Sequence, residues 1–226
     1  RFFFVSNRPK AQGSGTAGSY AIWVMEREGE GWGQPRNLGA PVNSEADEYF
    51  PSVTRWDTLY YTRENPDGTN SIYRSVWKDG RYQAPDKLPA QVNCGADRFN
   101  AFVSPDESYV ILPAVGVKDS LGGVDYYAAF RGADDTWTGP VNLGPAVNTK
   151  GSQEYSPYVS RDGRYFFFMS SRLKEGAVAA GESLDWPTLR AMHEAPGYGT
   201  PAVWWVDAGF IEGLRPKAPG SANKSR

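Results

Sequence analysis

The 226-residue sequence contains one cysteine, Cys94, and one histidine, His193. A single thiol cannot form an internal disulfide, and one residue of each type cannot build a cysteine-based zinc cluster or a histidine-rich metal site. The sequence also lacks an apolar run near the roughly 20 residues that a membrane-spanning helix needs. We therefore expect neither a metal, nor a cofactor, nor a membrane span.

Positive and negative charges are nearly balanced. The sequence has 24 Lys and Arg against 26 Asp and Glu, a formal net charge of -2, and the basic residues are scattered along the chain. Nucleic-acid binders carry a clustered basic surface, so no nucleic-acid partner is expected. Aromatic residues make up 14% of the chain, and they suit the half-buried surface of a β-sheet. With 25 Gly and 17 Pro to make turns, the composition favours an all-β protein.

An aromatic residue, a proline, a leucine, a valine and an asparagine recur together three times in the same order. The copies run from Trp32 to Asn43, from Tyr82 to Asn93 and from Trp137 to Asn148. The offsets between their first residues are 50 and 55 positions. Internal repeats with periods of about 20 to 50 residues are typical of solenoids and propellers.

Each copy closes a unit of four short strands. The first strands are expected at residues 49–53, 99–103 and 155–159, the second at 2–8, 59–63, 109–112 and 165–169, and the third at 20–26, 71–76, 124–130 and 202–207. Turn residues such as Ser104-Pro105-Asp106 separate them. Four short antiparallel strands per unit are typical of a propeller blade. We therefore predict a β-propeller with units at 1–49, 50–99, 100–155 and 156–215.

The repeat resembles the TolB-type propeller, whose units are called WD40-like β-propeller repeats. Two stretches carry the resemblance, Ser160–Phe167 followed by Ser170-Ser171-Arg172, and Val103–Asp106 in the unit before. The resemblance implies an exported bacterial protein, periplasmic or extracellular, although an export signal would lie upstream of this sequence. Two positions depart from the pattern, since Trp56-Asp57 replaces an Asp-Gly turn and Leu112-Pro113 replaces a Ser or Thr followed by Arg.

The two ends of the repeat array differ from its middle. The first unit lacks an innermost strand and the last lacks the fourth-strand motif, so we expect residues upstream of Arg1 to complete the ring. The last unit also carries an insertion at 173–200. Within it, residues 184–193 predict a short helix that is capped by Asp185 and has a proline in its first turn. The tail, 216–226, is expected to be disordered.

The connectors between units supply the candidate ligand-binding residues. In a ring, each connector runs from an outer strand to the next inner strand, so all of them would meet at the channel mouth. The candidates are Asp47, Glu48, Tyr49, Asp97, Arg98, Asn100, Gln153, Glu154 and Tyr155. Such groups could bind hydroxyls, stack on sugar rings or hold a cation. Alternatively, Glu48 and Glu154 pair with neighbouring arginines while the tyrosines pack between blades.

Other polar residues recur at fixed places in the repeat, which predicts structural duties. Arg8, Arg63 and Arg172 end their second strands and are expected to hydrogen-bond a loop or an adjacent blade. Asn43, Asn93 and Asn148 are expected to cap turns. The segment 65–70 predicts a β-turn, because it lacks the ligand alternation and closing Glu of a calcium-binding EF-hand.

These observations predict a binding scaffold that recognises a protein or a carbohydrate at the channel mouth and through the insertion. Nucleophilic catalysis has little support, because His193 has no serine or cysteine partner in a recognisable motif. The alternative is a carbohydrate-active hydrolase or lyase in which Glu48 and Glu154 act as acid and base, since glycosidases use two carboxyl groups. An enzyme should lose turnover but keep binding when Glu48 or Glu154 is replaced by Gln, whereas a scaffold should show no turnover on a panel of glycans.

Overall fold

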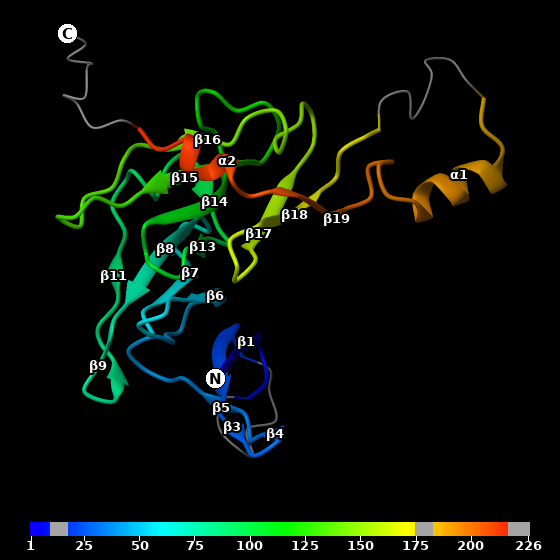
Figure 1. The fold of residues 1–226 in the computed structure, drawn as a ribbon. Helices are drawn as coiled ribbons and strands as arrows, with labels where there is room; N and C mark the ends of the chain where they lie inside the picture. Colours follow the sequence, from blue (N-terminus) through cyan, green and yellow to red (C-terminus); the bar gives the residue numbers. More distant parts are fainter. Residues whose placement is uncertain (10–17, 175–182, 217–226) are drawn as a thin grey trace, which may run out of the picture.

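The computed structural model describes residues 1–9, 18–174 and 183–216, and its regular structure is almost entirely β (Figure 1). The main strands form four successive antiparallel sheets, here called blades 1 to 4, and two further hairpins form small separate sheets beside blades 1 and 2. Blade 1 consists of β1 (Phe2–Ser6), β2 (Ala21–Met25) and β5 (Arg36–Asn37), with a small hairpin of β3 (Arg27–Glu28) and β4 (Gly31–Trp32). Blade 2 consists of β6 (Glu48–Val53), β7 (Leu59–Glu64), β8 (Asn70–Ser75) and β11 (Asp86–Lys87), with the hairpin β9 (Trp77–Lys78) and β10 (Arg81–Tyr82).

Blade 3 has an interrupted inner strand. It consists of β12 (Asp97–Arg98) and β13 (Phe102–Val103), which both pair with β14 (Tyr109–Val115), followed by β15 (Asp125–Phe130) and β16 (Val141–Asn142). Blade 4 consists of β17 (Glu154–Val159), β18 (Tyr165–Ser170) and β19 (Ala202–Asp207). The predicted fold class, a β-propeller of four-stranded antiparallel blades, is confirmed. The exact unit boundaries stay a prediction.

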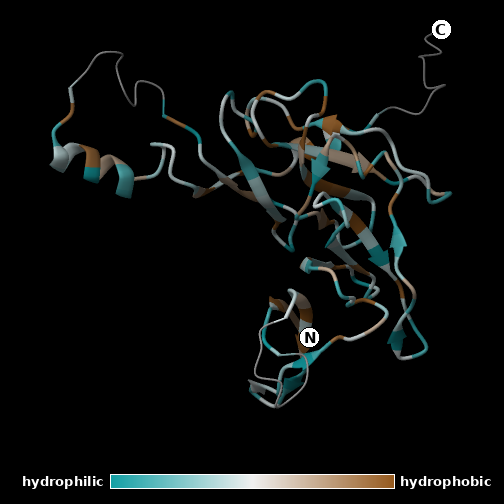
Figure 2. Ribbon diagram, turned by 180° about the vertical axis from the view of Figure 1, so that it is seen from behind, coloured by the Kyte–Doolittle hydropathy of each residue, from teal (hydrophilic) through white to brown (hydrophobic). Residues whose placement is uncertain are grey.

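The hydrophobic core lies between the blades. Alternate residues of a strand point to opposite faces of its sheet, so each middle strand packs on two neighbours. Val110 and Leu112 of β14 face blade 2 beside Tyr60, whereas Ile111 faces blade 4 beside Phe166. Figure 2 shows the hydrophobic residues gathered on the strands. The aromatic second and third strands of the repeat therefore provide the blade-to-blade packing.

An asparagine ends each repeated motif and pairs with the third strand of its own blade; Asn43 and Asn148 are buried, and Asn93 is partly buried. Asn148 accepts a hydrogen bond from the Tyr126 backbone N–H (2.8 Å) and donates to the Tyr126 carbonyl (3.0 Å). Asn43 makes the same two bonds to Ile22, and Asn93 makes them to Ile72. The side chain thus acts as one more residue of the outer strand. This duty is more specific than the predicted turn cap.

The recurrent arginines lie over aromatic rings of the second and third strands. Arg63 stacks on Tyr73 (4.8 Å to the ring centroid) and donates to the Val42 carbonyl of blade 1 (2.7 Å). Arg172 stacks on Trp204 (5.3 Å) and donates to the Val147 carbonyl. Both arginines therefore bond the preceding blade, as predicted, while Arg8 stacks on Phe4 and Trp23.

Two helices follow the strands. α1 (Trp186–Glu194) lies on an arm away from the sheets (Figure 1), and Asp185 caps it as predicted by accepting a hydrogen bond from the Thr188 N–H (2.9 Å). None of the helices in the described segments is long and apolar enough to cross a membrane. The short α2 (Phe210–Gly213) follows β19, where the sequence offered no fourth-strand motif, and its Ile211 packs between blades 3 and 4.

The segment 65–70 is a turn, as predicted. The Asn65 N–H donates to the Thr69 carbonyl (2.7 Å), and Gly68 adopts a positive φ of 80°. Two further expectations lie partly outside the described residues. They concern the insertion, of which 175–182 are not described, and the tail, of which 217–226 are not described.

We expect Asn148→Ala to lower the free energy of unfolding by about 1–3 kcal/mol, because the buried Tyr126 N–H and carbonyl would lose their side-chain partner. Urea unfolding followed by fluorescence measures the change. The matched control is Gln91→Ala, which truncates an exposed amide and should shift the midpoint by less than about 0.5 kcal/mol. Equal midpoints for the two variants would contradict the pairing role.

An ionic network joins blades 2 and 3 at their outer side. Arg74 of β8 makes two bonds to Asp135 of the loop after β15, at 2.8 and 2.9 Å. Arg131 bonds the same carboxylate at 2.6 Å and also pairs with Glu107. The hydrogen bonds from Arg74, together with those from Arg131, lower the pKa of Asp135 to about 2.

This pKa shift predicts an acid-sensitive blade contact. A carboxylate whose folded pKa is depressed stabilises the fold above its unfolded pKa, about 3.9, and that stabilisation is lost as the pH falls toward 2. Because Asp135 is half exposed, Asp135→Asn should cost less than about 1 kcal/mol at pH 6. The difference from wild type should vanish near pH 2. Thermal unfolding between pH 2 and 7 tests this, with the exposed Glu30→Gln as control; a gap that stays constant with pH would exclude the network.

Candidate functional site

A cavity of about 770 Å³ lies between the innermost strands of three blades. Its lining comes from β6 and the turn after it (residues 50–55), from β13 and Pro105, and from β17 with Arg161. Strands far apart in the sequence thus line one space. This is the arrangement that radial stacking produces, with inner strands about a shared axis.

Each inner strand that lines the cavity contains a β-bulge at the same position. Phe50, Asn100 and Ser156 have positive φ values of 51°, 49° and 59°, a left-handed conformation that is uncommon for residues other than glycine. In β6, Tyr49 pairs with Thr62 and Ser52 pairs with Tyr60, so two residues face one on β7. The same register shift occurs in β17. One extra residue per inner strand bends the chain at the same level in each blade.

Hydrogen bonds tie the bulged strands to one another. The Val103 N–H of β13 donates to Ser52 of β6 (3.0 Å), and the Asn100 amide donates to Ser156 of β17 (3.3 Å). The Asn100 N–H also donates to Thr62 of blade 2 (2.9 Å). The backbone around the cavity is therefore fixed from both sides.

The cavity wall is mostly apolar and carries positive charge. Phe102 and Tyr158 form an edge-to-face pair across β13 and β17, with centroids 5.8 Å apart, and Tyr158 is 49% exposed. Arg55 and Arg161 lie at the turn end of the strands, and no aspartate or glutamate is among the lining residues. Among the described residues, the Arg161 guanidinium has no hydrogen-bond or ion-pair partner. The wall suits a ligand with an apolar part and an anionic group.

The two predicted glutamates are buried at the opposite, connector end. Glu48 has no exposed surface; it accepts hydrogen bonds from Arg63 Nε (2.8 Å) and from the Ser44 N–H (3.0 Å). Glu154 is equally buried, and its Oε1 accepts from Thr149 (2.8 Å) and Ser170 (2.9 Å). Among the described residues, Glu154 Oε2 has no hydrogen-bond partner. Glu48 therefore forms the structural ion pair that the sequence left open as an alternative.

Blade 3 replaces this glutamate with Arg98. Its guanidinium, in a residue 8% exposed, donates to the carbonyls of Asn70 (2.7 Å), Gly95 (2.9 Å) and Cys94 (3.0 Å). Blade 3 also lacks the arginine found near the end of β7 (Arg63) and just after β18 (Arg172), the departure noted at Leu112-Pro113. A guanidinium thus reaches the connector carbonyls in each of blades 2 to 4, although in blade 3 it comes from a different strand.

Three other candidates belong to the junction of consecutive blades. Asp47 accepts a hydrogen bond from the Tyr20 N–H (2.7 Å), and Asp97 accepts one from the Asn70 N–H (2.8 Å). Each aspartate therefore caps the third strand of the preceding blade. Tyr49 donates to the Asn70 side chain (2.7 Å), and burial, reinforced by the charge of Asp97, raises its pKa.

The last candidates lie around β17. Gln153 is exposed; its backbone N–H donates a hydrogen bond to the Ser171 hydroxyl (3.0 Å), and its carbonyl accepts one from the Ser171 N–H (3.1 Å). The Tyr155 carbonyl accepts a hydrogen bond from the buried Tyr126 hydroxyl, whose pKa is raised by burial. The nine candidates are thus distributed over the blade junctions, and within the described part of the chain Asn100 is the one whose side chain bonds a cavity-lining residue, Ser156. Ligand binding by the nine residues stays a prediction.

The cavity residues are not among the sequence-predicted candidates, because those candidates are connector residues expected at the channel mouth, whereas the cavity is lined by the strands themselves. A signal was present, since Pro51 and Pro157 interrupt the first strands of two units. Proline cannot donate to a sheet ladder and is found at bulges and edges. The same two prolines mark the positions that line the cavity.

Comparisons with known proteins give structural neighbours only. No family model matches the chain, and a search of curated proteins finds no match. The structure is similar to that of the putative TolB from Agrobacterium tumefaciens, with a TM-score of 0.48 and 13% identity over 84% of this chain and 53% of that one. TolB from Acinetobacter baumannii gives a TM-score of 0.37 and 13% identity over 84% and 47%.

A puromycin-hydrolysing peptidase from Mycobacterium tuberculosis gives a TM-score of 0.45 and 14% identity over 69% of this chain and 26% of that one. TolB proteins are therefore among the structures that this chain is similar to, as the sequence motifs predict. The chain spans about half the length of the two TolB chains. At these identities the likeness concerns the fold alone.

The contrast between the two glutamates gives a test of their role. We expect Glu48→Gln to lower the free energy of unfolding by about 3 kcal/mol or more, because it leaves the Arg63 guanidinium without its buried carboxylate. Glu154→Gln should cost less, because its Oε2 has no hydrogen bond to lose among the described residues. Chemical unfolding at pH 7 measures both. A larger loss for Glu154→Gln would contradict the structural assignment.

Proposed function

We propose that this chain is a non-catalytic binding scaffold that holds a segment of a protein ligand in the cavity between the inner strands. The observation that supports this most is the lining, in which an apolar wall ends in two arginines with no lining carboxylate. An extended peptide fits such a wall, since its apolar side chains can contact Phe102 and Tyr158 while an acidic residue reaches Arg161. Desolvated aromatic and arginine groups are the residues that dominate protein interfaces.

The rigid backbone supports the same proposal. Bulges fixed by hydrogen bonds between β6, β13 and β17 pre-organise the wall, and a pre-organised site loses less conformational entropy when a ligand binds. The hydrolase alternative gains no support from the geometry. Glu48 and Glu154 have no exposed surface, so a glycan could contact them only if the connector end opened. Carbohydrate binding remains an outcome that the test below can reveal.

We also propose that the protein works outside the cytoplasm, in the periplasm or the extracellular space. The support is the resemblance of Ser160–Phe167 and Ser170-Ser171-Arg172 to the TolB-type repeat. The insertion with α1 would then be a second contact for a partner, since Trp186 on this helix is 74% exposed.

A random-peptide selection against the immobilised chain tests the cavity. We expect the selected peptides to combine apolar residues with an acidic one, and Arg161→Glu to weaken their binding by roughly tenfold through loss of a charge pair. Tyr158→Ala should weaken it as well. Replacing the acidic residue of the peptide with lysine should restore binding to Arg161→Glu. Calorimetry measures the dissociation constants.

Arg164→Glu is the matched control, because it reverses an exposed charge in the same turn but is not a lining residue. It should leave peptide affinity within about twofold. Peptides that bind wild type and Arg161→Glu equally well would refute the proposed site. A glycan that binds competitively at Tyr158 with higher affinity than any peptide would assign the site to carbohydrate.

A further inference from the structure

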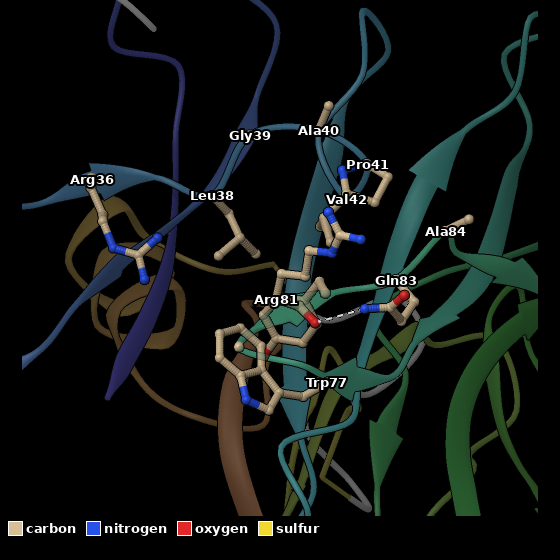
Figure 3. Close-up of a pocket in the computed structure, with 12 residues that line it drawn as sticks. Arg36, Leu38, Gly39, Ala40, Pro41, Val42, Trp77, Arg81, Gln83 and Ala84 are labelled. Carbon is tan, nitrogen blue, oxygen red and sulfur yellow. Dashed lines mark hydrogen bonds between the residues drawn. The ribbon is translucent and has the colours of Figure 1, made fainter.

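A second hollow, of about 430 Å³, lies between blades 1 and 2 near their outer edge. One wall is the end of β5 and the turn that follows it, residues 36–42, and the other is the hairpin β9–β10 with Gln83 and Ala84. Figure 3 shows the labelled side chains of this groove, in which Leu38 lies between Arg36 and Arg81 and Trp77 lies beside them. The volume falls in the range typical of small-molecule sites.

The repeat explains why a hollow exists here. In blades 2 and 3, the aromatic residue that opens the motif packs on the valine of the preceding blade and lies near its leucine. In blade 3 this residue is Trp137, which is 7% exposed and lies in one core cluster with Leu88 and Val92. In blade 2 it is the smaller Tyr82, which packs on Val42. The substitution of tyrosine for tryptophan gives this interface a smaller filling group.

Trp77 is held in a fixed orientation at the edge of the hollow. Its ring contacts that of Tyr82 edge to face, with centroids 4.8 Å apart and an interplanar angle of 73°. The Arg1 guanidinium stacks on the same indole at 4.7 Å. A half-buried indole that is fixed in this way offers a planar apolar surface at low entropic cost.

The charge of the lining is of one sign. Arg36 and Arg81 extend from opposite walls, and none of the lining residues is acidic. Arg36 forms a salt bridge with Glu26, with 3.3 Å between Arg36 Nη2 and Glu26 Oε1. The Arg81 guanidinium has no ion pair or hydrogen bond among the described residues; the Gln83 side-chain amide donates to the carbonyls of Lys78 (2.9 Å) and Arg81 (3.2 Å) and leaves the guanidinium unbonded. Arg81 is thus a cation available beside an apolar surface.

We propose that this groove is a separate binding site for a carboxylate carried on an apolar or aromatic body. The planar guanidinium of Arg81 matches a carboxylate with two parallel hydrogen bonds, and Leu38 and Trp77 provide the surface for the attached ring. This chemistry is shared by a free aryl acid and by the C-terminal phenylalanine of a peptide. The site is independent of the inner-strand cavity, since the two linings have no residue in common.

An NMR titration that observes the tryptophan indole N–H signals tests the proposal, with the Trp77 signal assigned from Trp77→Phe. The probes are 3-phenylpropionate, the uncharged 3-phenylpropanol and N-acetylglycyl-phenylalanine. We expect 3-phenylpropionate to shift the Trp77 signal and to bind at least about fivefold more tightly than the alcohol. Stronger binding by the peptide would identify a chain end as the ligand, and stronger binding by phenylpropionate would identify a small acid; either supports the site.

Arg81→Gln should weaken 3-phenylpropionate at least about fivefold, while Arg27→Gln should leave it unchanged. Arg27 is the matched control, because it is exposed in the corresponding hairpin of blade 1 and lies 5.5 Å from the Trp32 ring. Equal affinity for acid and alcohol, an unchanged affinity in Arg81→Gln, or shifts confined to tryptophans other than Trp77 would each overturn the proposal. None of these outcomes depends on the peptide result at Arg161, so the two sites succeed or fail separately.

Discussion

Burial of the connector between blades is the constraint on which the rest of this structure depends. Each blade must end its outer strand, turn toward the axis and begin the next inner strand without leaving backbone groups unpaired, since buried N–H and carbonyl groups without partners are costly. Where the outer strand ends, the asparagine of each motif hydrogen-bonds both the backbone N–H and the carbonyl of one third-strand residue. Where the next inner strand begins, Asp47 and Asp97 accept hydrogen bonds from the backbone N–H groups at the start of the third strand.

An arginine guanidinium completes each junction between blades. Its position in the junction recurs, but the strand that supplies the arginine is not the same in every blade. In blade 2 the guanidinium of Arg63 bonds both Glu48 and a connector carbonyl. In blade 3 the glutamate position itself carries the cation, and Arg98 bonds three carbonyls without a carboxylate. Both arrangements satisfy carbonyl groups that face the interior. The requirement is therefore for donors at that point, which explains why two departures from the repeat pattern, at Arg98 and at Leu112-Pro113, occur in the same blade.

The sequence predicted the strands well because their signals are local. Aromatic runs, turn residues and the recurrent motif located β7, β14, β18 and β19 to within a few residues, and Asp185 with Pro187 located α1. The site was harder to predict, because a polar residue next to a predicted channel mouth looks the same whether it binds a ligand or a neighbouring strand. Glu48 and Arg98 were chosen for their chemistry, and that chemistry is used by carbonyl and hydroxyl groups from other parts of the chain. Only the packed structure shows which polar groups are already paired.

The two ends of the inner strands therefore differ in how much a substitution that creates a ligand contact would destabilise the fold. At the connector end, Glu48, Arg98 and Glu154 are buried and needed for the junctions, so a substitution that favoured a ligand would also weaken the fold. At the turn end, the bulges at Phe50, Asn100 and Ser156 fix the backbone, and side chains such as Tyr158 and Arg161 project from it with few partners. Recognition can vary there at little cost in stability, because a scaffold separates its structural polar groups from those that meet solvent. This separation is the physical reason why we propose a ligand site at the turn end.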